Sequence, residues 1–130
     1  MGQEKLGAVD EAVIKAMGLF GGGVSSSGRT CGALLGAIAV ISCMYSRGNL
    51  TEKENPVMWK LGSKLVKKFE ELTEQHGGVN CQDIARVDWR DPQAVKEFRA
   101  DPESRRKFCA QLVGDISQVL GEIIEEETSK

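Results

Sequence analysis

The strongest constraint on the fold is a glycine- and serine-rich segment, residues 21–28, that leads into an apolar segment, residues 33–45. Thr30 can cap a helix that is apolar on almost every side and that ends near Ser46. Such a helix is expected at the centre of the protein, where other helices cover it. The apolar segment is shorter than the about 20 residues needed to span a bilayer. We therefore expect no membrane insertion.

The three prolines mark further helix starts, because each follows an asparagine or an aspartate. Such a side chain caps a helix, and proline suits the first helical position. The pattern predicts helices over residues 56–76, 92–98 and 102–126. Asn80 and Asp83 together predict a capped short helix that starts at Cys81.

Apolar residues at helical spacing predict the buried face of each main helix. In the first helix, before the glycine-rich loop, these are Leu6, Val9, Val13, Ile14 and Met17. In the 56–76 helix they are Leu61, Leu65, Phe69 and Leu72. In the last helix they are Cys109, Leu112, Val113, Ile116, Val119, Leu120, Ile123 and Ile124.

No segment shows the period-two alternation of a strand, and no internal repeat is present. The sequence predicts an all-α fold, a compact single domain over residues 1–130 with four main helices and several short ones. Residues 125–130 are expected to fray. We expect Gly32 and Gly36, which share one helix face, to permit close helix packing.

The net charge and the N-terminal segment indicate which partners and which location to expect. The net charge is −2, with 17 basic and 19 acidic residues, so the clustered basic excess of a nucleic-acid-binding protein is missing. The run Arg105, Arg106 and Lys107 is interpreted as a solvated helix face. No signal-peptide segment begins the sequence, which favours a cytoplasmic location. The four cysteines are then not expected to form structural disulfides.

Three cysteines could meet at one point. Cys31 and Cys81 stand at predicted helix N-termini, where unpaired amides and the helix dipole favour a reactive thiolate. Cys109 lies near the start of the last helix, on its buried face. The alternative for each is a small buried hydrophobic residue. Cys43 lies twelve residues beyond Cys31, or about 18 Å along a helix, so we interpret it as core packing.

Two weaker patterns accompany these cysteines. His76, the one histidine, could complete a zinc site of the Cys₃His type with Cys31, Cys81 and Cys109, or could instead interact with a helix dipole. Residues 23–30 nearly match a phosphate-binding loop, but that motif requires a preceding strand. A nest of backbone amides around a thiolate or another anion is the favoured alternative, and its glycines would be Gly21, Gly22, Gly23 and Gly28.

The segment Cys31-Gly32-Ala33-Leu34-Leu35-Gly36 resembles the signature of the C_GCAxxG_C_C family of small redox-active proteins. Residues 79–83 and 108–113 resemble the family's later cysteine segments. The resemblance implies an α-helical module that binds metal or carries out redox chemistry, with a [2Fe–2S] cluster as one candidate. The family's first-helix cysteine corresponds here to Val9. Four thiolates usually hold such a cluster, so the resemblance leaves one ligand to be supplied from elsewhere.

The leading hypothesis is thus a redox protein whose site comprises Cys31, Cys81 and Cys109, acting with a redox partner protein. These residues would either bind iron–sulfur or zinc, or cycle between dithiol and disulfide with Cys31 as the attacking thiolate. The alternative is a non-catalytic assembly module with no cofactor, which could pair as a homodimer through Gly32 and Gly36. A nucleotide-binding protein that uses Arg29 is the third possibility.

Overall fold

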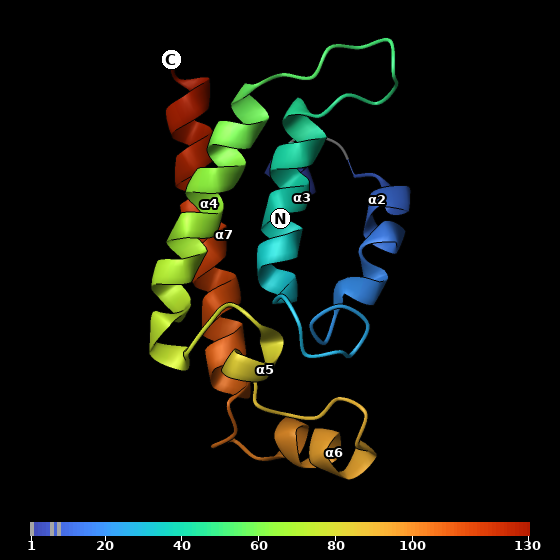
Figure 1. The fold of residues 1–130 in the computed structure, drawn as a ribbon, viewed down its shortest axis with the longest axis vertical. Coiled ribbons are helices and arrows are strands. Elements are labelled where there is room, and N and C mark those ends of the chain that lie inside the picture. The colour runs from blue at the N-terminus through green and yellow to red at the C-terminus, as the bar shows by residue number, and fades with distance from the viewer. Residues whose placement is uncertain (1, 6, 8) are drawn as a thin grey trace.

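The computed structural model describes residues 2–5, 7 and 9–130, and it is helical throughout its regular elements (Figure 1). Within these residues the only β-type pairing is an isolated bridge between Thr30 and Asn80. The predicted all-α class is confirmed. In chain order the elements are α1 Gly2–Lys5, α2 Glu11–Ala16, the 3₁₀ helix η1 Gly18–Phe20, α3 Gly32–Tyr45, α4 Val57–Thr73, the 3₁₀ helix η2 Glu74–His76, α5 Cys81–Ile84, α6 Pro92–Ala100 and α7 Arg106–Thr128.

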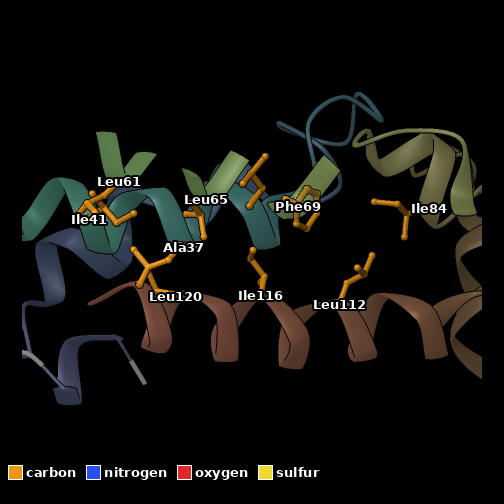
Figure 2. Packing of buried hydrophobic residues seen from close by; sticks show 11 residues of the cluster. Ala37, Ile41, Leu61, Leu65, Phe69, Ile84, Leu112, Ile116 and Leu120 are labelled. Atoms are coloured by element: carbon orange, nitrogen blue, oxygen red, sulfur yellow. The ribbon is translucent and has the colours of Figure 1, made fainter. Parts of the chain in front are cut away.

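The long helices α3, α4 and α7 enclose the hydrophobic core. Their side chains point toward one another, and Ile84 of α5 closes the core at the end where Leu112 lies (Figure 2). Residues four apart repeat on one helix face, and α4 accordingly buries Leu61, Leu65 and Phe69. Likewise α7 buries Leu112, Ile116, Leu120 and Ile123. The predicted inward faces of these two helices are confirmed except at Val113, which is 53% exposed.

Helix α3 is less enclosed than its apolar sequence predicts. It packs against α4 and α7, but only Leu34, Ala37 and Ile41 are buried. Among the described residues, a Cβ built at Gly36 would meet nothing within 4 Å, so this glycine makes no close helix contact there. Pairing of two copies through this face stays a prediction, which sedimentation analysis would test.

The first predicted helix is wrong in extent and in its buried face. Asp10 caps α2 by accepting a hydrogen bond from the Ala12 amide, so the helix begins after Val9. Val9 is 67% exposed and Ile14 is 57% exposed, whereas Leu6 lies outside the described residues. The six-residue α2 is too short to cover the core with an apolar stripe, and it contributes no buried residue.

Most predicted helix starts are confirmed by their capping contacts. Asp91 accepts from the Gln93 and Ala94 amides, Asn55 accepts from the Val57 amide, and Asn80 forms the expected capping box with Asp83. The predicted start at Pro102 is wrong: Asp101 organises a turn by accepting from the Glu103 amide, and α7 begins at Arg106.

The end of α7 also differs from the prediction. Its helix continues to Thr128, and ion pairs join Lys64 to Glu126 and Lys60 to Glu127 across to α4. These contacts between neighbouring helices hold residues that were expected to fray. Among the described helices, none is long and apolar enough to cross a membrane.

Candidate redox site

The backbone brings two of the candidate cysteines together. Thr30 and Asn80 form the antiparallel bridge, and Cys31 and Cys81 follow them directly. The Cys31 amide donates to the Val79 carbonyl at 3.1 Å, and the Cys81 amide donates to the Arg29 carbonyl at 2.6 Å. The two cysteines are therefore diagonal neighbours across the bridge, and diagonal neighbours lie about 7–8 Å apart. The region lies where the loop before α3 meets α5 (Figure 1).

A left-handed turn covers this bridge. Residues 22–26 all have positive φ, including the non-glycine residues Val24, Ser25 and Ser26. Left-handed backbone costs an L-residue about 1–2 kcal/mol, so the turn persists only because its surroundings stabilise it. A Cβ added at Gly23 would lie 2.5 Å from the Cys81 Cβ. The glycine-rich loop thus packs directly on the candidate site.

Most amides of the glycine-rich loop are occupied by local hydrogen bonds. Those of residues 24–29 donate to carbonyls of residues 19–24, for example Gly28 to Gly22 at 3.0 Å and Arg29 to Gly23 at 2.9 Å. Of the four glycines expected to form a nest of free amides, Gly28 therefore has its amide occupied. The phosphate-loop alternative also lacks its strand, because η1 precedes the turn. Gly23 and Gly28 instead permit close packing against Cys81 and Gln82.

Cys31, rather than the predicted Thr30, is the N-terminal cap residue of α3. Its side chain is half-buried. Burial raises the pKa of the Cys31 thiol, and the nearby backbone amides of Ala33 and Leu34 oppose this rise in part. The start of α3 therefore acts to lower the pKa of Cys31, as expected, but desolvation raises this pKa by more.

Cys81 is buried, with 9% of its surface exposed. The indole Nε1–H of Trp89 donates to its Sγ at 3.2 Å. Trp89 is held by an edge contact with Phe98 of α6, whose ring centroid lies 5.3 Å away. Sequence reasoning missed Trp89, because no motif links a tryptophan to a cysteine eight residues earlier.

Cys109 lies in the first turn of α7 and is also half-buried. Burial, followed by the neighbouring Cys81 and Cys31, raises its pKa to about 11, although Arg105 acts in the opposite direction. The charges of the three cysteines thus act on one another. Cys43 is exposed on α3, so its predicted role in core packing is wrong. The buried residues of this helix are Leu34, Ala37 and Ile41 instead.

His76 and Arg105 form a buried polar pair beside the thiols. His76 is 6% exposed, and its Nδ1 accepts a hydrogen bond from Arg105 Nη2 at 2.8 Å. Arg105 Nε also donates to the Ile84 carbonyl at 2.6 Å. The prediction that Arg105 belongs to a solvated helix face is therefore wrong.

Within the described residues no group of three histidine, cysteine, aspartate or glutamate side chains is arranged to hold a metal ion.

This environment makes a prediction for acid stability. Burial, and then the charges of Arg105 and Arg86, lower the pKa of His76 below its ordinary 6.5. The unfolded chain therefore binds a proton more readily, and the free energy of unfolding should fall as the pH drops below 6.5. In His76→Gln this decline should be shallower. Urea unfolding between pH 5 and pH 8 would measure it, and equal slopes in both proteins would contradict the prediction.

Comparison with known proteins identifies a family for this chain. No curated protein and no solved structure matches the chain. A family model described as "Putative redox-active protein (C_GCAxxG_C_C)" matches residues 1–123. The match includes the turn, the bridge and all three clustered cysteines, and it covers nearly the whole sequence. The chain therefore belongs to the C_GCAxxG_C_C family.

Proposed function

We propose that this protein is a thiol redox protein in which Cys31 and Cys81 cycle between a dithiol and a disulfide. The observation that carries the proposal is the Thr30–Asn80 bridge, which fixes the two cysteines on adjacent backbone segments. A disulfide requires Cα atoms about 4.4–6.8 Å apart, so the two bridged segments would have to approach each other by only a small distance. Family membership supports redox activity in general terms.

The surroundings suggest different roles for the three thiols. Cys31 is more exposed than Cys81 and lies at the start of α3, which suits the attacking cysteine. Cys81 is buried and receives the Trp89 hydrogen bond, which suits a resolving cysteine that a partner molecule does not reach directly. Cys109, with a pKa of about 11, stays protonated at neutral pH and is the poorest nucleophile.

The proposed reaction is a thiol–disulfide exchange with a disulfide on a partner molecule. Cys31 attacks that disulfide and releases one partner thiolate, and a mixed disulfide forms. Cys81 then attacks the Cys31 sulfur and releases the second partner thiolate. The dithiol loses two electrons and two protons, and the partner disulfide gains them. A redox partner protein would supply that disulfide.

Oxidation of the purified protein tests this proposal. Equilibration with glutathione and glutathione disulfide should remove two free thiols, and peptide mass spectrometry should find Cys31 joined to Cys81. Cys31→Ser and Cys81→Ser should each abolish this intramolecular disulfide, whereas Cys43→Ser should leave it unchanged. Full retention of both thiols under oxidising conditions would refute the dithiol and favour the non-catalytic module.

A metal centre is the second candidate, because the charges of Cys31, Cys81 and Cys109 act on one another. The residues in place fit it less well. His76 Nδ1 is engaged by Arg105, and Val9 occupies the family's first cysteine position on an exposed segment. Elemental analysis of anaerobically purified protein separates the candidates. Stoichiometric iron with acid-labile sulfide would favour a cluster over the dithiol, and zinc without sulfide would favour a Cys₃His site.

A further inference from the structure

A polar pocket lies on the outer side of the candidate redox site. It has a volume of about 300 Å³ and lies between the left-handed turn and the loop that joins α5 to α6. This is the lower end of the size range of small-molecule sites, about 300–1,000 Å³. Its lining residues are Ser26, Ser27, Gly28, Gln82, Arg86, Val87, Asp88, Trp89 and Arg90.

Two arginines dominate the charge of this pocket. Arg86 is held by hydrogen bonds from Nε to the Asp83 carbonyl and from Nη2 to the His76 carbonyl. Those acceptors are neutral, so they orient the guanidinium without neutralising it. Arg90 is exposed. In the described part of the chain, neither arginine forms an ion pair with a carboxylate.

One carboxylate also lines the pocket. Asp88 Oδ1 accepts a hydrogen bond from the Arg90 amide at 2.9 Å, so this side chain organises the loop. Its charge offsets one of the two arginines and leaves the lining with a net positive charge. Guanidinium groups recognise carboxylate and phosphate groups through paired hydrogen bonds. Ser26 and Gln82 add further polar groups, and both are exposed.

We propose that this pocket binds a small molecule that carries a phosphate or carboxylate group, with Arg86 and Arg90 as its main contacts. The indole of Trp89 lines the same pocket while its Nε1–H donates to Cys81. A bound anion would therefore touch the residue that contacts the buried thiol. The binding site does not depend on any thiol reaction, so it stands independently of the proposed redox function.

Titration of the full-length protein with inorganic phosphate, at constant ionic strength set by sodium chloride, tests the proposal. In amide NMR spectra we expect saturable shifts of the Trp89 indole N–H and of the amides of residues 26–28 and 86–90. A parallel titration with succinate distinguishes phosphate from carboxylate recognition. Tighter binding of either anion identifies the preferred group, and failure of both to saturate overturns the proposal.

Charge variants show whether the pocket itself is responsible. Arg90→Gln should weaken phosphate binding about three- to fivefold, the range for an exposed charged contact worth up to about 1 kcal/mol. Asp88→Asn should strengthen it by a similar factor, because it removes a repelling charge and keeps the Oδ1 acceptor. The matched control is Arg47→Gln, which removes the same charge from the exposed loop after α3.

The opposite signs expected for Asp88 and Arg90 separate a binding role from a structural one. If Arg90→Gln and Arg47→Gln behave alike, or if Asp88→Asn weakens binding, the proposal is overturned. Cys81→Ser should retain saturable phosphate binding even though it would abolish the disulfide. Failure of the anion site and failure of the redox function therefore give different results.

Discussion

Replacement of Gly23 by alanine should lower the free energy of unfolding by about 2–5 kcal/mol, through left-handed strain and overpacking together. Gly23 has φ +69°, and its added Cβ would lie 2.6 Å from both the amide nitrogen and the carbonyl oxygen of Arg29. Backbone atoms cannot rotate away as a flexible side chain can. The turn, the bridge and Cys81 would have to separate, and the Cys31–Cys81 disulfide should form less readily.

The matched control is Gly36→Ala in α3. Nothing lies within 4 Å of its added Cβ, and the position is helical. Alanine should stabilise the helix there by about 0.5–1 kcal/mol. Urea denaturation followed by circular dichroism would compare the two variants. Equal stability of Gly23→Ala and the wild type would contradict the close packing between the turn and Cys81.

Replacement of Arg105 by alanine should lower the free energy of unfolding by about 2–4 kcal/mol, because two buried acceptors lose their donor. These are His76 Nδ1 at 2.8 Å and the Ile84 carbonyl at 2.6 Å. The guanidinium also lies 4.8 Å from the ring centroid of Phe108. One side chain therefore connects η2, α5 and the start of α7.

The same substitution should change the chemistry of a neighbouring thiol. Arg105 lowers the pKa of Cys109, so its removal should raise that pKa further and slow alkylation of Cys109 at alkaline pH. Lys107→Ala is the control, because it removes an exposed charge whose ion pair with Glu103 lies on the surface. It should change stability by less than about 0.5 kcal/mol. An equally small change in Arg105→Ala would show that its buried hydrogen bonds contribute little.

The proposed redox site and the fold depend on the same contacts. The Thr30–Asn80 bridge joins the loop before α3 to α5, and Ile84 of α5 closes the core beside Leu112. Oxidation of Cys31 and Cys81 would cross-link these two segments. We therefore expect the redox state to alter stability as well as reactivity.

Local rules explain what the sequence alone determined. Asp91, Asn80 and Asn55 cap helices because each side chain reaches amides only two or three residues away. Leu61, Leu65 and Phe69 are buried because their spacing of four places them on one face of a helix. The ordered cysteines and the glycine-rich loop sufficed to indicate the family.

Contacts between distant segments were decided only by the tertiary structure. The sequence did not show that Trp89 donates to Cys81, or that Arg105 turns inward to His76, twenty-nine residues away. It also misassigned Val9 and Ile14, since an amphipathic pattern cannot show whether a short helix finds a surface to cover. The left-handed turn at residues 22–26 was likewise decided by tertiary contacts. Its strain is unfavourable locally and is offset only by packing against Cys81 and the backbone of Arg29, which lie together only once the chain has folded.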